Sequence, residues 1–257
     1  MTSPQSPLLG QSAFITGGAR RIGRAIALSL ARAGADITLT YRTSKTEALQ
    51  TKADVEALGR RAQAVCCDVR SEGSVRAAVA AHITAHNRLD ILINNAAIFE
   101  TAPLDTLTLA QWDAVFETNT RGPFLVAREA LPHLRTARGR IVNIGSLGGI
   151  QPWAGHAHYC ASKAAVHMLT QTMAKAFAPE VAVNCVAPGW IEMTENGMSQ
   201  QGAAQVAAQD RAARFAAKTP MGRNGAAEDV ARAVLFFAAA AEFITGQILT
   251  VDGGLGL

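Results

Sequence analysis

The stretch Ser12-Ala-Phe-Ile-Thr16-Gly17-Gly-Ala-Arg-Arg-Ile-Gly23 decides the fold of this chain. Its first five residues form a short apolar run that favours a strand, and the glycines after it favour a tight turn. From residue 24 to residue 33 the apolar side chains recur at helical spacing, and Gly34 is a usual residue after a helix. A strand, a glycine turn and a helix in this order direct the amides of the helix N-terminus at a phosphate. We therefore expect a phosphate-binding turn near the start of an α/β fold.

Apolar runs and helical segments alternate from this stretch to the C-terminus. The predicted strands cover residues 12–16, 36–42, 62–67, 89–94, 140–145, 181–187 and 247–251. The predicted helices cover residues 24–33, 71–85, 109–134, 157–177 and 227–240. Seven strands with interposed helices predict a Rossmann-type, doubly wound α/β sheet that is mainly parallel and has helices on both faces. No repeat or clear boundary interrupts the pattern, so residues 1–257 are expected to form a single domain.

Two segments differ from this regular pattern. Residues 1–10 are polar and rich in proline, and we expect a flexible tail there rather than a secretory leader. Residues 192–218 form a long polar stretch after Pro188-Gly189, at the carboxyl edge of the predicted sheet. Long insertions at such an edge often close over a bound molecule, so this segment is predicted to be a substrate lid.

Charge and composition exclude several classes of partner. The net charge is +4, but the 24 Lys and Arg side chains are scattered, so nucleic acid is not an expected partner. No apolar run, including the one that covers residues 234–241, is long enough to span a membrane. The four cysteines lack the spacing of metal ligands, so no metal site is expected. We expect a cytoplasmic protein whose thiols are buried and reduced.

A second stretch, residues 146–163, contains the candidate catalytic groups. Tyr159 and Lys163 are four residues apart, so a helix would place them on one face. An ammonium close to a phenol favours the phenolate and lowers the phenol pKa from about 10. Such a phenol can exchange a proton with an alcohol or carbonyl oxygen, and Ser146 could donate a hydrogen bond to the same oxygen. Taken alone, the pair is equally compatible with an ordinary contact on a helix surface.

The choice of dinucleotide depends on the second predicted strand. Asp36 has the usual sequence distance from the first glycine for an acidic residue that binds the ribose of NAD. It stands at the start of its strand, however, whereas ligands bind at the carboxyl ends. Tyr41, Arg42, Thr43 and Ser44 lie at the carboxyl end, and a guanidinium beside hydroxyls suits the 2′-phosphate of NADP. The sequence therefore predicts NADP(H) rather than NAD as the cofactor.

In their order and spacing, these residues resemble the short-chain dehydrogenase/reductase family over nearly the whole chain. The matching pieces are Thr16-Gly17 to Gly23, Asp68-Val69, Asn94-Asn95-Ala96-Ala97, Asn119, Ser146, Tyr159, Lys163, Pro188-Gly189, Thr245-Gly246 and Val251-Asp252-Gly253-Gly254. The resemblance implies an oxidoreductase whose single dinucleotide-binding catalytic domain spans residues 1–257. Members of the family are commonly tetramers, so we expect a homotetramer, with a homodimer as the alternative.

The resemblance also implies a role for each candidate residue. In that family a tyrosine is the general acid/base, a lysine holds the nicotinamide ribose, a serine binds the reacting oxygen and an asparagine positions a water in the proton relay. These roles fall on Tyr159, Lys163, Ser146 and Asn119. The expected cofactor-binding residues are Thr16, Gly17, Arg20, Arg21, Ile22, Gly23, Tyr41, Arg42, Thr43, Ser44, Asp68, Val69, Asn95, Ala96, Ala97, Tyr159, Lys163, Pro188, Gly189, Ile191 and Thr194. The residues expected near the substrate are Phe99, Trp153, Trp190 and Met193.

Three positions depart from the family pattern. Arg21 and Ala97 replace glycines, and Met193 occupies the position of an expected hydroxyl, with Thr194 one residue later. This last change leaves open which group binds the nicotinamide carboxamide. Arg21 is similar to an arginine of the pteridine reductase branch, which also has a phenylalanine where this chain has Phe99. That branch generally has an aspartate at the position of Ser146.

These features predict NADPH-dependent reduction of a carbonyl to an alcohol, with Tyr159 as the general acid. The expected substrate is a 3-oxoacyl thioester or a related ketone. A pteridine or dihydrofolate reductase that uses Arg21 and Phe99 is the alternative within the same chemistry. A non-catalytic dinucleotide-binding sensor or scaffold is the alternative of another class, and the intact set of four catalytic residues argues against it.

Overall fold

The computed structural model describes residues 6–192, 203–239 and 243–257, and within them seven strands form one sheet. The strands are β1 (Ser12–Ile15), β2 (Asp36–Tyr41), β3 (Ala62–Cys66), β4 (Ile91–Asn94), β5 (Arg140–Ile144), β6 (Ala182–Pro188) and β7 (Ile248–Val251). They lie in the order β3-β2-β1-β4-β5-β6-β7, and every neighbouring pair is parallel. The predicted seven-stranded, Rossmann-type sheet is therefore confirmed.

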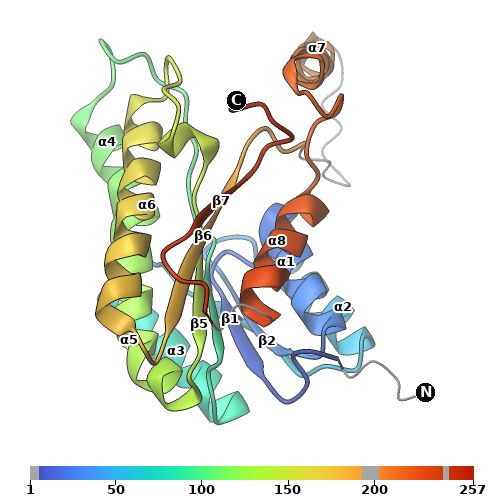
Figure 1. Cartoon of the computed structure of the whole chain (residues 1–257), viewed down its shortest axis with the longest axis vertical. Helices are drawn as coiled ribbons and strands as arrows, with labels where there is room; N and C mark the ends of the chain where they lie inside the picture. The colour runs from blue at the N-terminus through green and yellow to red at the C-terminus, as the bar shows by residue number, and fades with distance from the viewer. Residues whose placement is uncertain (1–5, 193–202, 240–242) are drawn as a thin grey trace.

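Helices cover both faces of the sheet (Figure 1). One face is covered by α1 (Arg21–Arg32), α2 (Lys45–Ala57) and α8 (Ala227–Ala239). The other is covered by α3 (Glu72–His86), α4 (Leu109–Phe116), the π-helical turn η1 (Glu117–Arg121), α5 (Gly122–Ala137) and α6 (Ala157–Phe177). A short 3₁₀ turn, η2 (Leu147–Gly149), follows β5, and α7 (Ala203–Lys218) lies beyond the carboxyl edge of the sheet.

The alternation of side chains along β1 shows how one sheet builds two cores. Ala13 and Ile15 pack in the cluster beneath α1 and α8, whereas Phe14 packs in the cluster beneath α3, α5 and α6. All three side chains are almost fully buried. Successive residues of a strand point to opposite faces, so an apolar run with no polar residue is what a doubly covered strand needs.

The candidate site is placed by the position of β1 between β2 and β4. In the register of the sheet, Ile15 lies opposite Leu39 of β2 and Ile93 of β4. The connection after β1 leads to β2 on one side of it, whereas the connection after β3 leads back to β4 on the other side of β1. The carboxyl end of β1 is therefore the topological switch point of the sheet. Ligands of open α/β sheets bind in the crevice at this point. The turns that follow β1, β2 and β4 therefore meet where the sequence predicts the dinucleotide.

Two helices go beyond the predicted elements. The helix α2 buries only Ala48, Thr51 and Val55, so its apolar face is too narrow to stand out in the sequence. The helix α7 occupies the second part of the segment 192–218 that is predicted to be a lid. Residues 193–202 lie outside the described part of the chain, so the lid stays a prediction. The helix predicted at 157–177, by contrast, has the bounds of α6.

The predicted helix at 109–134 is divided by the π-helical turn η1. The N–H of Gly122 bonds to the carbonyl oxygen of Glu117, five residues earlier, and the next residue, Pro123, has no N–H to donate. The missing N–H of Pro123 interrupts the hydrogen bonds of the helix, and the wider turn lets the helix continue past this point. Turns of this kind are frequent at functional sites, and this one contains Asn119.

Part of the predicted tail, residues 1–10, is packed rather than flexible. Leu8 is fully buried, and its N–H donates to the carbonyl oxygen of Ala33 at 2.9 Å. Gly34 permits this packing, because a Cβ there would lie 2.8 Å from the backbone nitrogen of Leu9. The prediction of a flexible tail is therefore wrong at Leu8, whereas residues 1–5 lie outside the described residues.

Two further observations concern membranes and thiols. Among the helices that the structure describes, none combines the length and the apolar character needed to cross a bilayer. All four cysteines are free, but only Cys67 and Cys185 are buried, whereas Cys66 is exposed. The expectation of buried thiols is therefore correct for two of the four and wrong for Cys66, which ends an edge strand.

Candidate active site

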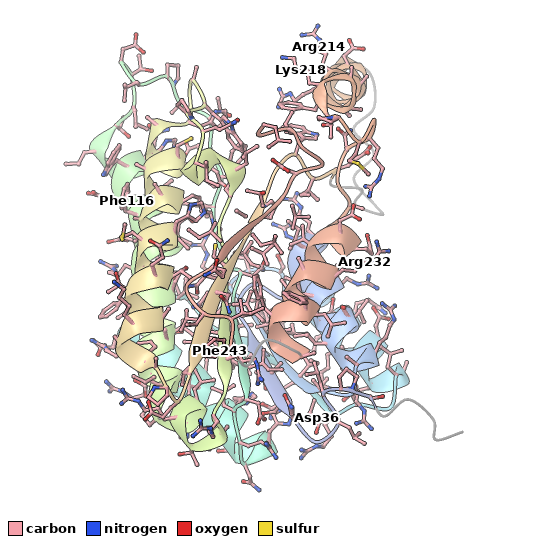
Figure 2. The ribbon with its side chains drawn as sticks, in the orientation of Figure 1. Asp36, Phe116, Arg214, Lys218, Arg232 and Phe243 are labelled. Carbon is pink, nitrogen blue, oxygen red and sulfur yellow. The ribbon has the colours of Figure 1, made fainter. Side chains whose placement is uncertain are left out.

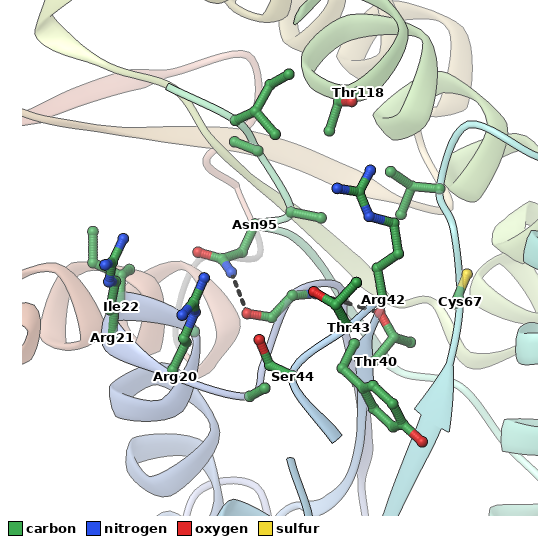
Figure 3. A pocket seen from close by; sticks show the side chains of 18 of the residues that line it. Arg20, Arg21, Ile22, Thr40, Arg42, Thr43, Ser44, Cys67, Asn95 and Thr118 are labelled. Atoms are coloured by element: carbon green, nitrogen blue, oxygen red, sulfur yellow. Dashed lines mark hydrogen bonds between the residues drawn. The ribbon is translucent and has the colours of Figure 1, made fainter. Parts of the chain in front are cut away.

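A cavity of about 430 Å³ opens at the carboxyl ends of β1, β2 and β4 (Figure 3). Its lining includes most of the predicted cofactor residues, namely Gly17, Arg20, Arg21, Ile22, Gly23, Tyr41, Arg42, Thr43, Ser44, Asp68, Val69, Asn95, Ala96, Ala97 and Tyr159. Ala19, Thr40, Cys67, Ile98 and Thr118 also line it without having been predicted. Each of these five is next in the sequence to a predicted residue, so extending the prediction by one position would have found them.

The glycine turn after β1 is fitted closely against the turn after β4. A Cβ at Gly23 would lie 2.2 Å from the carbonyl oxygen of Gly17, and one at Gly17 would lie 3.0 Å from the Cα of Ala96. The amide of Asn95 donates to the carbonyl oxygens of Thr16 and Gly17 at 3.0 and 2.9 Å. The hydroxyl of Thr16 accepts from the N–H groups of Asn95 and Ala96. Thr16 is buried behind the turn and holds it, rather than lining the cavity.

The N-terminus of α1 faces the cavity, and it begins with two adjacent arginines, Arg20 and Arg21. Arg20, the N-cap residue, makes no side-chain cap to the helix, so the first amides remain available to an anion. Arg21 has a φ of 52°, in the left-handed region that favours glycine. The turn thus keeps the backbone shape of a glycine loop although the residue is arginine. Figure 3 shows Arg20 and Arg21 on one side of the cavity and Arg42 on the other.

Asp36 lies at the opposite end of β2 from this cavity. Its carboxylate binds the side chain of Arg61 at 2.7 Å, and Figure 2 shows it at the end of the sheet away from α7. Burial acts to raise the pKa of Asp36, but hydrogen bonds from Arg61 outweigh burial and lower it. The structure therefore agrees with the expectation that Asp36 is not a ribose ligand, and Arg42 lines the cavity as predicted.

Asp68 also lines the cavity, and its charge is already paired. The guanidinium of Arg70 donates to both carboxylate oxygens, at 2.9 Å to Oδ1 and 2.6 Å to Oδ2. Hydrogen bonds from the Arg70 side chain hold the pKa of Asp68 at about 2. The carboxylate is thus ionised at any working pH and accepts hydrogen bonds at the rim of the cavity.

Tyr159, Ser146 and Lys163 meet where β5 ends against α6. Ser146 and Lys163 are almost fully buried. The hydroxyl of Ser146 accepts from the N–H of Gly148 at 3.1 Å and lies beside the phenol of Tyr159. The ammonium of Lys163 donates to the carbonyl oxygen of Ile144 at 2.7 Å, and its Nζ lies 5.8 Å from the centre of the Tyr159 ring.

The expected effect of Lys163 on the Tyr159 pKa is wrong for this structure. Burial of the phenol raises the pKa of Tyr159, and the nearby hydroxyl of Ser146 offsets only part of that rise. The physical reason is the direction of the lysine, whose ammonium is bound to Ile144 rather than to the phenol. Burial also lowers the pKa of Lys163, from 10.5 to about 8.

Asn119 joins three parts of the site from its π-helical turn. Its side-chain oxygen accepts from the N–H of Ile98 at 2.9 Å, and its amide donates to the carbonyl oxygen of Ile98 at 3.0 Å. The same amide donates to the hydroxyl of Ser162 at 3.1 Å, which in turn donates to the carbonyl oxygen of Tyr159. Asn119 thereby ties the loop after β4 to the first turns of α6.

Aromatic rings surround the phenol of Tyr159. Phe99 is 55% exposed at the rim of the cavity, stacks on His156 with 4.7 Å between ring centres, and meets Tyr159 edge-on at 4.8 Å. Trp153 lies nearly parallel to Tyr159, with 6.2 Å between ring centres. Of the predicted substrate residues, Phe99 and Trp153 are thus brought to Tyr159.

The remaining predicted residues lie elsewhere. Trp190 stacks on Phe215 of α7 at 4.0 Å instead of joining the rings around Tyr159. Lys163, Pro188, Gly189 and Ile191 do not line the cavity, although Lys163 lies behind Tyr159. Met193 and Thr194 are outside the described part of the chain, so nothing tests their predicted contacts.

This arrangement combines two chemical abilities at one edge of the sheet. The glycine turn, the N-terminus of α1 and three arginines can bind a phosphorylated nucleotide. Beside it, the half-buried phenol of Tyr159, with a hydroxyl and an ammonium nearby, can transfer a proton. Comparisons with known proteins extend these observations.

A family model described as enoyl-(acyl carrier protein) reductase matches residues 17–256. The chain is 37% identical over 254 residues to a 3-oxoacyl-[acyl-carrier-protein] reductase of Synechocystis sp., covering 96% of this chain and 98% of that protein. It is 35% identical over 254 residues to 3beta-hydroxysteroid dehydrogenase 1 of Eggerthella lenta, covering 97% and 95%.

Solved structures match over similar lengths. A short-chain dehydrogenase/reductase of Serratia marcescens has a TM-score of 0.88 at 32% identity, covering 98% of this chain and 100% of that one. A dehydrogenase/reductase of Sinorhizobium meliloti has a TM-score of 0.86 at 36% identity, covering 98% of each chain. The matches therefore span the whole sheet, the cavity and the residues around Tyr159.

Proposed function

Because the chain belongs to the short-chain dehydrogenase/reductase family of oxidoreductases, we propose that it reduces a carbonyl to an alcohol with NADPH and with Tyr159 as the general acid. One observation carries this proposal. An arginine-lined cavity and the phenol of Tyr159, with the hydroxyl of Ser146 beside it, meet at the same edge of the sheet.

The residues around the cavity fit NADP(H). Gly17 and Gly23 leave no room for side chains, as the close approach of a pyrophosphate requires. Arg42, with the hydroxyls of Thr43 and Ser44, would hold the 2′-phosphate. When bound, the nicotinamide would supply the hydride, and the chain supplies orientation and the proton.

The proton in this proposal comes from the hydroxyl of Tyr159. Its raised pKa keeps the phenol protonated at neutral pH, which is the form that reduction of a carbonyl needs. The hydroxyl of Ser146 accepts from Gly148, which leaves its own proton to bind the carbonyl oxygen. Asn119 fixes the first turns of α6, and Lys163 holds the end of β5, so both keep Tyr159 and Ser146 in place. We also assign Asn119 and Lys163 to the relay that returns a proton to the phenol.

The proposed substrate is a 3-oxoacyl thioester or a related ketone. Two relatives have names that refer to an oxo or a hydroxy group at position 3 of their substrate. Phe99 and Trp153 would bound the substrate on the side of Tyr159.

A substrate panel tests this function. Acetoacetyl thioesters, diketones and simple ketones are each mixed with NADPH or NADH, and the absorbance of the reduced nicotinamide is followed. Oxidation of NADPH by at least one ketone in the wild-type protein, and its loss in Tyr159→Phe, are the expected results. A protein that binds NADPH but reduces no carbonyl would instead be the sensor or scaffold.

A pteridine or dihydrofolate reductase is the second candidate, and two residues favour it. Arg21 lines the cavity at the phosphate end, and Phe99 offers an exposed ring face at the rim. Ser146, where that branch generally has aspartate, argues for the ketone. Biopterin and dihydrofolate belong in the same panel, and a rate above that of every ketone would favour this candidate.

We further propose that the chain forms a homotetramer, with a homodimer as the alternative. A groove on the outer face of α4, η1, α5 and α6 is lined by Phe116, Phe124 and Met168, and Figure 2 shows Phe116 on this face. Phe124 and Met168 are exposed, so a second copy of these helices would bury them. Light scattering of the wild type and of Met168→Glu, which should dissociate, tests this assembly.

A further inference from the structure

His167 lies against the loop that contains Ser146. It follows Lys163 by one turn of α6 and Tyr159 by two turns, so the three side chains share one face of the helix. The imidazole is almost fully buried, and its Nε2 accepts a hydrogen bond from the backbone N–H of Ser146 at 3.4 Å. None of the catalytic roles described above uses this side chain.

Two glycines make room for the imidazole. A Cβ at Gly145 would lie 2.4 Å from Nε2 of His167, and a Cβ at Gly149 would lie 2.7 Å from Cε1. Both distances are too short for real contacts, so a side chain at either position would displace the ring or the loop. The loop 145–149 is therefore folded closely against His167, at both sides of Ser146.

The hydrogen bond defines the protonation state of the ring. Because the Ser146 N–H donates, Nε2 carries the lone pair, and the proton of the neutral ring is on Nδ1. Burial, and then the charge of Lys163, lower the pKa of His167 to about 4. Cys185 of β6 also packs beside Gly145, and burial raises the pKa of its thiol to about 12. At neutral pH the ring thus remains an acceptor for Ser146.

We propose that His167 is a positioning residue that holds the backbone of Ser146 so that the serine hydroxyl faces the substrate oxygen beside Tyr159. The inference rests on the proposed function, because it gives Ser146 its role. The serine is then held at two points, with its N–H on His167 and its Oγ on the N–H of Gly148. Displacing a reacting group by about 1 Å can cost on the order of 100-fold in rate.

Two variants distinguish the effect of losing the hydrogen-bond acceptor of His167 from the effect of losing the volume of its ring. His167→Leu fills the space without an acceptor, whereas His167→Gln keeps an acceptor oxygen. With the best ketone, the Leu variant should lose roughly 10- to 100-fold in kcat, with its Kd for NADPH within about twofold of wild type. The Gln variant should recover most of that loss. A Leu variant as fast as wild type, or equal losses in both variants, would overturn the proposal.

A control and a double variant exclude a merely structural effect. Val166→Ala removes buried methyl groups at the adjacent position of α6, so it should lower Tm but leave kcat unchanged. An equal loss of kcat in this control would contradict the proposal. In a Ser146→Ala background, His167→Leu should cost less than about threefold more, because it acts through the serine. A full additional loss would show that His167 acts elsewhere.

Nitrogen NMR of the histidine side chains tests the hydrogen bond without activity. At neutral pH the ring of His167 should carry its proton on Nδ1 and an accepting lone pair on Nε2. A proton on Nε2, or a charged ring, overturns the proposal. If the wild-type protein reduces no carbonyl, the proposed function fails, while this spectrum still decides whether His167 holds Ser146.

Discussion

The ammonium of Lys163 donates a hydrogen bond to the backbone carbonyl oxygen of Ile144 at 2.7 Å. This bond joins α6 to the end of β5, the strand that leads directly into Ser146. Lys163 is only 3% exposed, so its charge is held in a poorly solvated place. We therefore expect the residue to affect the stability of the fold as well as the proposed proton transfer at Tyr159.

Replacing Lys163 by Met should stabilise the protein and abolish turnover. Burial lowers the lysine pKa from 10.5 to about 8, so between these pH values the unfolded chain binds more protons and wild-type stability rises with pH. At pH 7 the charged lysine costs about 3 kcal/mol. Loss of the bond to Ile144 offsets about 1 kcal/mol of this gain, so Lys163→Met should be more stable than wild type by about 2 kcal/mol. Urea unfolding at neutral and alkaline pH measures both effects.

Lys175→Met is the matched control for this prediction. Lys175 lies on the exposed side of the same helix, so its replacement should change neither the stability nor its dependence on pH. A Lys163→Met protein that is less stable than wild type at neutral pH would contradict the expectation.

Tyr159 should give the two directions of the reaction different pH profiles. Burial raises the pKa of Tyr159 from its usual value, and the nearby hydroxyl of Ser146 offsets only part of the rise. Carbonyl reduction uses the protonated phenol, so its kcat should stay level from neutral pH to about pH 9. Alcohol oxidation uses the phenolate, so its kcat should rise with pH over the same range. Tyr159→Phe should lower both rates by about 10²–10⁴-fold.

Steady-state rates in both directions across this pH range are the measurement. A reduction rate that falls with a midpoint near neutral pH would show that the phenol is more acidic than its burial implies. A Tyr159→Phe protein with a near wild-type rate would remove the tyrosine from the proposed mechanism altogether.

The fold and most of the cavity were predictable because they depend on local patterns. Apolar runs define doubly covered strands, the glycine turn after β1 requires small residues, and Arg42 follows from the direction of its strand. The sequence distance of Asp36 from the glycines suggests NAD. Its position at the start of the strand excludes this reading, and the ion pair with Arg61 agrees.

The features that the sequence did not reveal depend on contacts between distant residues. The π-helical turn at Asn119 accompanies bonds to Ile98 and Ser162, which lie on other elements. The ammonium of Lys163 could have faced the phenol at helical spacing, and only the position of β5 directs it to Ile144. In the same way, the packing of Leu8 requires the end of α1 to be in place.

Arg21→Gly should distinguish the effect of the turn's backbone conformation on stability from the effect of the Arg21 charge on binding. The left-handed conformation costs a residue other than glycine about 1–2 kcal/mol, partly offset by the greater flexibility of glycine when unfolded. The free energy of unfolding should therefore be unchanged or raised by up to about 1 kcal/mol. NADPH should bind more weakly, and any reduction of pterins should fall more than reduction of ketones. Calorimetry and the substrate panel measure these effects, and equal losses for both substrates would exclude a substrate contact.

Phe99→Ala should change substrate preference without changing stability. Phe99 is half-exposed, so the variant's free energy of unfolding should differ from that of the wild type by less than about 0.5 kcal/mol. Loss of its ring face beside His156 and Tyr159 should raise KM for flat, ring-containing substrates by roughly 5- to 20-fold, about 1–2 kcal/mol. Phe236→Ala, at an exposed ring outside the cavity lining, is the control and should leave KM unchanged. Unchanged KM values for Phe99→Ala would place the substrate elsewhere.

Arg42→Ala and Arg61→Ala together test the assignment of NADP(H). The two arginines lie at opposite ends of the same pair of strands, since Arg42 follows β2 at the cavity and Arg61 precedes β3 beside Asp36. A charge-assisted hydrogen bond to the 2′-phosphate is worth about 1.5–3 kcal/mol, so Arg42→Ala should weaken NADPH binding by about 10- to 100-fold. NADH lacks this phosphate, so its Kd should change less than about twofold. Titration calorimetry with both nucleotides is the measurement, and Arg61→Ala should leave both Kd values unchanged. Equal losses for NADPH and NADH in Arg42→Ala would mean that the guanidinium binds a group common to both, and the preference for NADP(H) would then need another source.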